Sequence, residues 1–587
     1  MDLIQKVNTK ILLFLEKFKK NALLTLFIIG FLVYANSFLN GFVLDDVNQI
    51  LGNSAVHSIS NIPTLFTGST FSDGASTLRG NYYKPVMTLV YTIIYSTFGP
   101  IAFPFHLVQL ILFILNAWLL YKLLCKWFSK NLSFFASMLF LVHPLNSEAV
   151  LYISSLQDVL FMFFGLLALL IFIHKPFNRF NLLSTFILLF MSILSKETGV
   201  LFFAVLLLYQ YLYEKKYLRL SIVISFFTGI FYLFLKYFIA GISLTVNPFA
   251  TITRLKLDQR LLQIPAILEF YFKTFFFPKD LIAVQNWVVG SITFYTFYFP
   301  LIICLSVALF IASLFLIFKT IEIRKKLTFF SVWLILGLLL HLQIQPLDAT
   351  VADRWFYFPM IGLVGIILII FEKIRFKKKY FQILLLATVF ILLALSLRSF
   401  LRTFDYRNEY ALASHDLAFQ PDNFVLQNSL GLQFQSRGNL NEAKIHFEKA
   451  IQIDPGNNMA WHNLGFLYEQ EGAKNNSQSL YKLADNYYQK AINTGGDPNS
   501  YINLAELRLF KENFNLLKTD KFLEVSLNKF PNNPKLLLMH SITLYKLGNK
   551  NRALKEISKA IKIQPQNSQL IQIYQWIINN QQINLTP

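Results

Sequence analysis

Two adjacent carboxylates, Asp45 and Asp46, follow the first long apolar stretch of the chain, about residues 22–39. A stretch of that length can enter a bilayer, so the pair is expected just past a membrane surface. A carboxylate can act as a general base when its pKa rises toward neutrality, and an adjacent charge or a partly dry site raises it. Carboxylate oxygens also bind hard divalent cations such as Mg or Mn, so either residue could hold one. Gly41, just before the pair, permits a tight bend toward a site.

Further ionisable residues gather in three other turns between apolar stretches. They are His143, Glu148 and Asp158 in HPLNSEAVLYISSLQD, Lys196 and Glu197 in SKETG, and Asp348, Asp353 and Arg354 in DATVADRWFYFP. Ionisable groups near a membrane are costly, so their gathering on one face favours a site over scatter. Each also has a structural alternative: His143 before a proline can end a helix, Glu197 can cap the next helix, and Arg354 can anchor in headgroups.

The composition divides the chain into a membrane part and a soluble part. Of 587 residues, 55% are hydrophobic and only 14% are charged, which excludes a wholly soluble protein. Apolar stretches recur from residue 22 to about 397 and stop after about 405. We therefore expect an all-α chain with a multi-spanning membrane domain at residues 1–404 and a soluble domain at residues 405–587.

The positive charge lies between the apolar stretches. The net charge is +21, but the soluble part has 19 Lys and Arg against 16 Asp and Glu, so nucleic acid is not an expected partner. The remaining charge forms short clusters at Lys17/Lys19/Lys20, Lys122/Lys126/Lys130, Lys175/Arg179, Lys215/Lys216/Arg219, Arg324/Lys325/Lys326 and Lys373/Arg375/Lys377/Lys378/Lys379. Clusters of this kind mark cytoplasmic loops. The basic N-terminus, with no small-residue cleavage site after the first stretch, predicts an uncleaved first helix that starts in the cytoplasm.

Threading the chain through these clusters predicts about eleven spans. They are residues 22–39, 105–124, 131–143, 159–174, 180–195, 199–213, 220–239, 292–318, 328–344, 356–371 and 380–397. Two other apolar stretches, 86–96 and 264–277, are expected to lie along the surface or to be re-entrant. An odd count places the soluble domain outside with Asp45, whereas an even count would place it in the cytoplasm.

The soluble part contains an internal repeat. LGLQFQSRGNLNEAKIHFEKAIQIDP, at 430–455, recurs as LGFLYEQEG and, after the insert AKNNSQS, as LADNYYQKAI; a third copy begins near NLAELRLFKENF. The last copy repeats Gly438, Ala443, Ala450 and Pro455 as Gly548, Ala553, Ala560 and Pro565. The period of about 34 residues resembles the tetratricopeptide repeat. About four repeats and a capping helix, NSQLIQIYQWIIN, would form an α-solenoid that binds an extended peptide or a partner protein, or serves only as a spacer.

Several motifs occur in a recognisable order. FVLDD after the first span, HPLNSEAVLYISSLQDVL, SKETG, DRWFYFP and the C-terminal repeats resemble the transmembrane and tetratricopeptide-repeat O-mannosyltransferases and their prokaryotic relatives. These belong to the GT-C class of membrane glycosyltransferases. The resemblance covers nearly the whole chain.

The resemblance implies an inverting transfer of a mannose-like sugar from a polyprenyl-phosphate donor to an acceptor hydroxyl, such as Ser or Thr of a protein, on the extracytoplasmic face. Asp46 or Asp45 would take the acceptor's proton, with Asp46 weakly preferred, and the other would hold the loop or bind a divalent ion. Lys196 and Arg354 would bind the donor phosphate. The rest of the site would be His143, Glu148, Asp158, Glu197 and Asp353.

Other functions remain open on the sequence. A polysaccharide polymerase or ligase of the same class would use the repeats to bind assembly partners. A transporter would show repeated halves and polar groups deep within spans, and the sequence shows neither. A non-catalytic scaffold would use only its repeats. The Asn, Lys, Ile and Phe bias favours a prokaryotic cell membrane; in a eukaryote the outer face would be the endoplasmic reticulum lumen.

Overall fold

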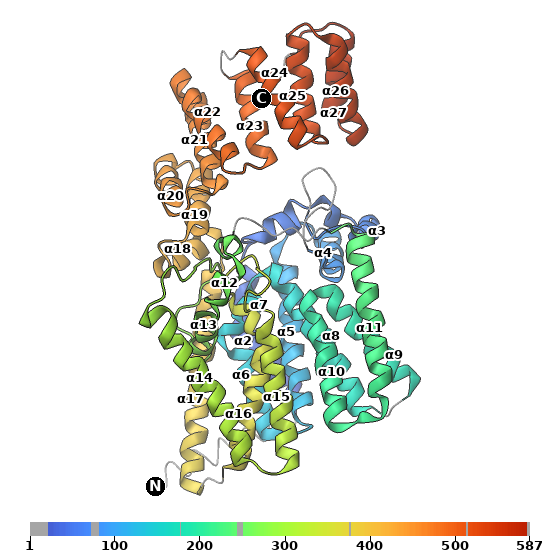
Figure 1. Ribbon diagram of the computed structural model, residues 1–587, viewed down its shortest axis with the longest axis vertical. Helices are drawn as coiled ribbons and strands as arrows, with labels where there is room; N and C mark the ends of the chain where they lie inside the picture. The colour runs from blue at the N-terminus through green and yellow to red at the C-terminus, as the bar shows by residue number, and fades with distance from the viewer. Residues whose placement is uncertain are drawn as a thin grey trace. The chain divides into compact units, whose positions relative to one another are not determined.

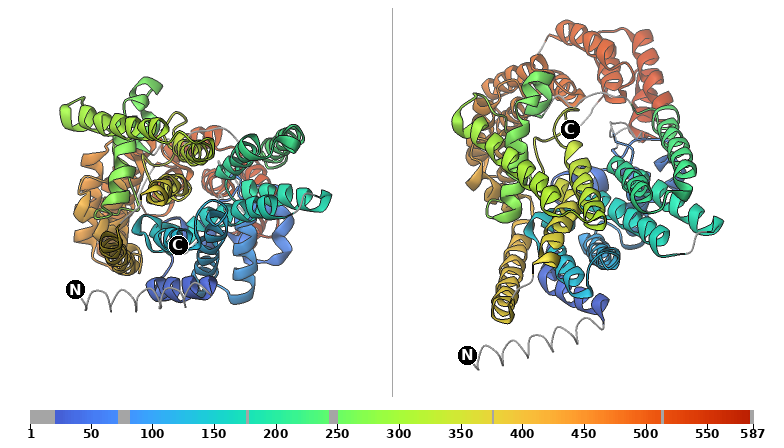
Figure 2. Two further views of the ribbon diagram at one scale, coloured as in Figure 1. Left: turned by 90° about the horizontal axis from the view of Figure 1, so that it is seen from below. Right: turned by 60° about the horizontal axis from the view of Figure 1, so that its bottom comes forward.

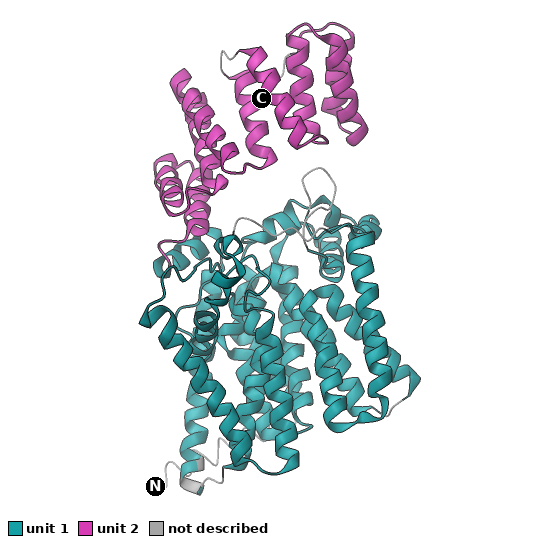
Figure 3. Cartoon of the chain, in the orientation of Figure 1, with its two compact units in different colours: residues 1–419 teal, residues 420–587 magenta. Residues whose placement is uncertain are grey.

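Two compact units, residues 1–419 and 420–587, make up the chain (Figure 3). The computed structural model describes residues 21–71, 82–175, 178–242, 250–374, 377–511 and 515–583, so the expected cytoplasmic segment 1–20 lies outside the described residues. Within the described ranges the only β-type pairing is the single bridge between Gln285 and Val351. The predicted all-α class is confirmed.

The first unit ends one helix later than the sequence boundary at residue 404. That helix, α18 (Glu409–Phe419), buries Leu412 and Asp416 against the first unit. The Asp416 carboxylate accepts a hydrogen bond of 2.8 Å from the backbone N–H of Ala283. Hydropathy missed this helix because it is short and polar, and only its contacts assign it to the membrane part.

The first unit is a bundle of helices (Figure 1). Besides α18 it contains α2 (Ala22–Tyr34), α3 (Ile62–Leu65), α4 (Pro85–Phe98), α5 (Ala102–Leu124), α6 (Lys130–Val142), α7 (Ser147–Leu151), α8 (Leu156–His174), α9 (Arg179–Ser195), α10 (Val200–Tyr213), α11 (Leu218–Phe234), α12 (Leu257–Leu261), α13 (Ile264–Phe276), α14 (Phe299–Ile317), α15 (Ile321–Leu339), α16 (Pro359–Lys373) and α17 (Lys378–Asp405). The views of Figures 1 and 2 agree that α8–α11, drawn teal to green, lie together on one side of this unit.

Each of the eleven predicted apolar stretches contains a helix, but fewer meet the length and composition of a span. Among the described residues, six do: Ala22–Leu39, Ala102–Leu124, Ile153–His174, Lys215–Ile239, Phe294–Ile317 and Gln382–Asp405. A seventh would be the pair Lys130–Val142 and Pro144–Leu151, which is bent by 56°. Helices α9, α10 and α16 are shorter, and α15 carries charge in its first turns. The chain is therefore an integral multi-pass membrane protein, and the count of eleven stays a prediction.

The basic turns meet at one end of the bundle. The Lys326 ammonium, at the start of α15, donates to the carbonyl of Trp127, after α5, at 2.8 Å. It also lies 3.2 Å from the carboxylate of Glu372, at the end of α16. The neighbouring Lys325 lies over the Tyr213 ring at the end of α10. Turns that are far apart in sequence thus share one end, as their charge predicts.

The opposite end joins the segment after α2 to the end of α17. Asn36 and Asn40 bond the hydroxyl and the carbonyl of Thr403 at 2.8 and 3.0 Å. The Leu44 N–H donates to the Glu409 carboxylate at 2.7 Å. The chain therefore leaves the last helix of the bundle at the end that carries Asp45.

The second unit consists of four helix pairs and a closing helix. The pairs are α19 (Phe424–Ser436) with α20 (Leu440–Ile453), α21 (Asn458–Asn475) with α22 (Gln478–Asn493), α23 (Pro498–Phe510) with α24 (Leu516–Lys529), and α25 (Pro534–Lys546) with α26 (Lys550–Ile563); α27 (Ser568–Ile578) follows. This matches the four repeats and cap expected from the sequence. The insert AKNNSQS lengthens α21 and forms its turn to α22.

Glycines in the first helix of a repeat let an aromatic ring of the second helix approach. A Cβ placed on Gly431 would lie 2.5 Å from the Phe447 ring, and one on Gly465 would lie 2.7 Å from the Tyr488 ring. Both rings are fully buried. The repeat spacing in the sequence therefore records where two helices touch.

Candidate active site

Asp46 is fully buried, and its carboxylate holds the segment after α2 in place. One oxygen accepts from the backbone N–H and the hydroxyl of Ser154 at 2.7 and 2.6 Å. The other accepts from the Val43 N–H at 3.1 Å. Burial raises the pKa of Asp46 to about 7, although these hydrogen bonds act in the opposite direction. The carboxylate links this segment to the start of α8.

Asp45 differs from its neighbour because its side chain is exposed. Its backbone N–H donates to the Tyr152 hydroxyl at 3.1 Å. Within the described part of the chain, nothing hydrogen-bonds to or pairs with its carboxylate. The sharp bend before the pair is at Leu44, whose φ is 50°, rather than at Gly41. A leucine in this left-handed region is uncommon, and the Glu409 contact at its N–H holds it there.

Glu148 and Arg354 form a buried ion pair between α7 and the segment before α16. One Glu148 oxygen accepts from the Arg354 guanidinium, and the other accepts from the Arg354 backbone N–H at 3.0 Å. The guanidinium lies 5.6 Å from the centroid of the Tyr152 ring. Tyr152 therefore touches the site twice, through its hydroxyl at Asp45 and through its ring at Arg354.

Asp158 gathers the two predicted phosphate-binding cations. Lys196 Nζ lies 2.5 Å from one Asp158 oxygen, and Arg354 Nε lies 4.0 Å from the other. Only 2% of the Asp158 side chain is exposed, against 12% for Lys196 and 19% for Arg354. The turn after α9 and the turn before α16 thus meet at one carboxylate at the start of α8.

Two of the predicted site residues have roles that their local contacts explain. His143 accepts from the Leu145 N–H through Nδ1 and donates from Nε2 to the Phe275 carbonyl at 2.9 Å, which fixes its tautomer. This arrangement matches the structural alternative for a histidine at a helix end. Glu197 pairs with Lys236, after α11, at 3.3 Å. It therefore joins α9 to α11 at the edge of the group.

Two aspartates come from the segment before α16. Asp353 is buried, and its Oδ1 has no hydrogen-bond partner among the described residues. Burial raises its pKa well above the usual range, and the Glu148 charge adds to this, which favours the neutral carboxyl. Asp348 is exposed, yet surrounding protein raises its pKa to about 6, and Asp45 adds to the effect. The Asp348 charge thus lies near Asp45.

One cation of this region was not among the predicted site residues. Lys84 directly precedes α4, and it is only 7% exposed. Glu197, Lys196, Asp158 and Asp45 all lie close enough to affect its pKa. The available signal was a lysine beside an apolar stretch on the face where the positive-inside rule disfavours one.

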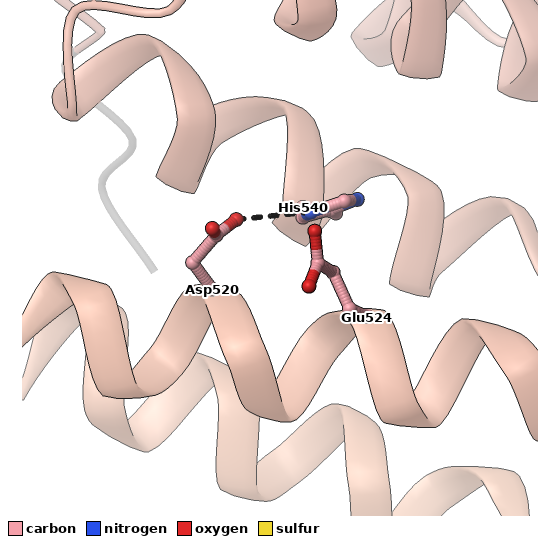
Figure 4. Close-up of side chains that lie close together, drawn as sticks. All are labelled: Asp520, Glu524 and His540. Atoms are coloured by element: carbon pink, nitrogen blue, oxygen red, sulfur yellow. Dashed lines mark hydrogen bonds and ion pairs between the residues drawn. The ribbon is translucent and has the colours of Figure 1, made fainter.

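A different group of possible metal ligands lies in the second unit. Among the described residues, Asp520, Glu524 and His540 are the only three His, Cys, Asp or Glu residues whose ligand atoms lie within 4.8 Å of one another (Figure 4). His540 and Asp520 bond each other at 3.0 Å, and Glu524 bonds Arg552 at 2.7 Å. These protein contacts account for the group.

In the predicted catalytic pair, Asp46 has both oxygens engaged, so Asp45 is the member with oxygens free for a cation.

Comparisons with known proteins agree with the arrangement. A tetratricopeptide repeat profile matches residues 426–457 and 534–567. Protein O-mannosyl-transferase TMTC3 of Homo sapiens is 23% identical over 595 aligned positions, which cover 92% of this chain and 63% of that protein. Protein O-mannosyl-transferase F38B6.6 of Caenorhabditis elegans is 23% identical over 74% of this chain and 63% of that protein. The chain therefore spans about 63% of the length of these relatives.

Among solved structures, the tetratricopeptide repeat protein YrrB is 14% identical, with 29% of this chain and 82% of that chain covered and a TM-score of 0.24. The similarity to the O-mannosyl-transferases covers both the multi-pass helices and the repeats. The chain is thus a relative of the transmembrane and tetratricopeptide-repeat protein O-mannosyl-transferases.

Proposed function

We propose that this chain is a membrane glycosyltransferase. It moves a mannose-like sugar from a polyprenyl-phosphate carrier to an acceptor hydroxyl, Ser or Thr of a protein, at the extracytoplasmic face. One observation carries the proposal: the backbone N–H of Asp45, whose side chain is exposed, bonds the Tyr152 hydroxyl, and the guanidinium of Arg354 lies over the ring of the same tyrosine. A proton acceptor and a cationic group thus come together at the end of the bundle opposite the basic turns.

The reaction needs a base and a stabilised leaving group. The Asp45 carboxylate takes the proton of the acceptor hydroxyl while the oxygen of that hydroxyl forms a bond to C1 of the sugar. The bond from C1 to the phosphate oxygen breaks, and its electrons remain on the departing polyprenyl phosphate. Attack from the face opposite the phosphate inverts C1. Phosphate is a good leaving group, so no acid is required, and cations stabilise the charge that it gains.

The geometry favours Asp45 over Asp46 as the base, which reverses the weak preference drawn from the sequence. Asp46 accepts three hydrogen bonds and is fully buried, so an acceptor hydroxyl cannot reach it without displacing Ser154 or Val43. Asp45 is exposed, and no described group occupies its carboxylate. The expectation that adjacent carboxylates have different roles is retained, with the roles exchanged.

The predicted phosphate ligands are already charge-paired. Lys196 lies on Asp158, and Arg354 lies on Glu148 and near Asp158. These acids orient the two cations, in the way that carboxylates around a binding site commonly do. Arg354 Nε is buried and has no hydrogen-bond partner within the described residues, so a phosphate that approached it would gain a donor without displacing the Glu148 pair.

The repeats are proposed to hold the acceptor on the same side of the membrane. The support is the path of the chain: α17 ends beside the segment that carries Asp45, and Glu409 bonds Leu44. The linker into the second unit therefore starts at the catalytic end. Stacked tetratricopeptide repeats offer a concave surface suited to an extended peptide.

The test is transfer by the purified full chain. It would be incubated with radiolabelled polyprenyl-phosphate mannose, glucose and galactose, together with acceptor protein or glycan. We expect label on a protein hydroxyl from one donor and loss of transfer in Asp45→Asn. Label that enters only a glycan would indicate a polysaccharide polymerase or ligase. The absence of transfer from every donor would contradict the proposed glycosyltransferase activity and would favour a non-catalytic scaffold.

A further inference from the structure

Lys84 is a buried cation at the candidate active site. It precedes Pro85, the first residue of α4, and 7% of its surface is exposed. Its Nζ lies 4.1 Å from the centroid of the Tyr82 ring. Among the described residues, no acceptor hydrogen-bonds to this nitrogen and no carboxylate lies within ion-pair distance of it.

The charges that act on Lys84 come from three other parts of the site. They are Glu197, Lys196, Asp158 and Asp45. Glu197 and Lys196 belong to the turn after α9, Asp158 to the start of α8, and Asp45 to the segment after α2. Lys84 therefore adds a fourth segment to the site, the one that directly precedes α4.

The other cations of this region already have acidic partners. Lys196 is paired with Asp158, Lys236 with Glu197, and Arg354 with Glu148. Lys84 is the one site cation, within the described ranges, that has only an aromatic ring and more distant charges around it. A buried ammonium without a partner is costly, and burial lowers its pKa to about 8. An anionic ligand would offset that cost.

We propose that Lys84 binds the phosphate of the lipid carrier, an inference that rests on the proposed glycosyl transfer. The phosphate monoester of the spent carrier gives Lys84 the counter-charge that the protein lacks. Lys196 and Arg354 remain paired with their acids. Lys84 differs from Lys326 at the basic end, which is also 7% exposed but bonds Trp127 and Glu372.

The experiment measures binding separately from transfer. The full chain, in lipid nanodiscs, would be titrated at pH 7 with undecaprenyl phosphate, undecaprenol and inorganic phosphate. The variants are Lys84→Met, Lys84→Gln, Lys84→Arg and, as the matched buried control, Lys326→Met. Thermal unfolding of each variant would be measured in the same discs. Lys84→Met breaks no ion pair within the described residues, so it should remain folded, whereas Lys326→Met should unfold at a lower temperature.

We expect Lys84→Met to weaken undecaprenyl phosphate binding by roughly tenfold to a hundredfold, the usual range for losing a charged hydrogen bond. Lys84→Arg should retain most of the affinity, and undecaprenol should bind all proteins equally. Competition by inorganic phosphate alone would indicate a phosphate site that does not require the lipid. Wild-type affinity of folded Lys84→Met or Lys84→Gln for undecaprenyl phosphate would overturn the proposal, as would no binding by the wild type.

The two proposals fail in distinguishable ways. If the wild type transfers sugar and Lys84→Met binds undecaprenyl phosphate normally, only the role of Lys84 is wrong. If Lys84→Met loses affinity but no polyprenyl-phosphate sugar is a donor, Lys84 still binds the lipid phosphate and the proposed transfer is wrong.

Discussion

Asp46 and Ser154 are joined by two hydrogen bonds, from the backbone N–H and the hydroxyl of Ser154 to one carboxylate oxygen, although 108 positions separate them. The contact fastens the segment after α2 to the start of α8. It also decides which of the two adjacent aspartates is exposed. Adjacent side chains point in different directions, so the side chain of Asp45 faces outward when that of Asp46 is buried on Ser154.

The first prediction compares the two aspartates. Asp45→Asn should lower kcat by about 10²–10⁴-fold, the usual effect of removing a general base, and leave donor binding unchanged. Asp46→Asn should lower the unfolding temperature. The NH₂ group of the asparagine would replace one of the two accepting oxygens and would face the backbone N–H of either Val43 or Ser154, which is also a donor. Steady-state kinetics and thermal unfolding of both variants separate the two roles. Equal kcat in Asp45→Asn and wild type would place the base elsewhere, with Asp348 the next carboxylate to change.

The second prediction concerns pH and Asp46. Its folded pKa of about 7 lies above the usual 3.8, so the folded state holds the proton more tightly than the unfolded state. The contribution of Asp46 to stability should therefore be complete below pH 3.8 and decrease as the pH rises through 7. The difference in unfolding temperature between wild type and Asp46→Asn, measured from pH 4 to 8, isolates it from other groups. If the unfolding temperature of the wild type rises relative to that of Asp46→Asn as the pH increases, the raised pKa of Asp46 is contradicted.

The third prediction tests the sidedness of the two units. In a chain whose Cys125 and Cys304 are replaced by Ser, Gly52→Cys and Gln470→Cys should both react with an impermeant maleimide in intact cells. Both positions are exposed, and the chain enters the second unit at the Asp45 end. Lys216→Cys, exposed in a basic turn, should react only after permeabilisation. Labelling of only one of positions 52 and 470 from outside would refute the shared face.

The fourth prediction concerns packing in the first repeat. Gly431→Ala places a Cβ 2.5 Å from the fully buried Phe447 ring, and overpacking of this kind costs about 1–3 kcal/mol. Hydrogen exchange should accelerate in α19 and α20 and remain unchanged in α25 and α26. Adding Phe447→Leu should restore part of the protection. Unchanged exchange in Gly431→Ala would mean that the helices can separate without cost.

The fifth prediction follows from Lys84 and the charges around it, which are Glu197, Lys196, Asp158 and Asp45. With a pKa near 8 the free amine loses its proton above that pH, so undecaprenyl phosphate should bind about tenfold more weakly per pH unit beyond it. Lys84→Arg stays charged and should show a flat profile to pH 10. A wild-type profile as flat as that of Lys84→Arg would mean that Lys84 does not contact the phosphate.

Much of the architecture could be predicted because it depends on local patterns. Hydropathy located the helices of the bundle, since an apolar stretch of sufficient length must leave water wherever the rest of the chain lies. The pair Gly431 and Phe447 recurs as Gly465 and Tyr488, separated further by the insert AKNNSQS, and in both pairs the glycine packs against the ring. Basic turns indicated which helix ends share a face, and the contacts of Lys326 agree.

The sequence by itself determined that carboxylates and cations from four turns face one side of a helical membrane protein followed by repeats. Only the tertiary structure decided which of them are buried, exposed or paired. It buried Asp46 on Ser154 and exposed Asp45, placed Lys196 and Arg354 on Asp158, and left Lys84 without an acidic partner among the described residues. The physical reason is that hydropathy and repeat spacing are properties of neighbouring residues. Exposure and charge pairing depend on which distant turns the packed helices bring within hydrogen-bonding distance.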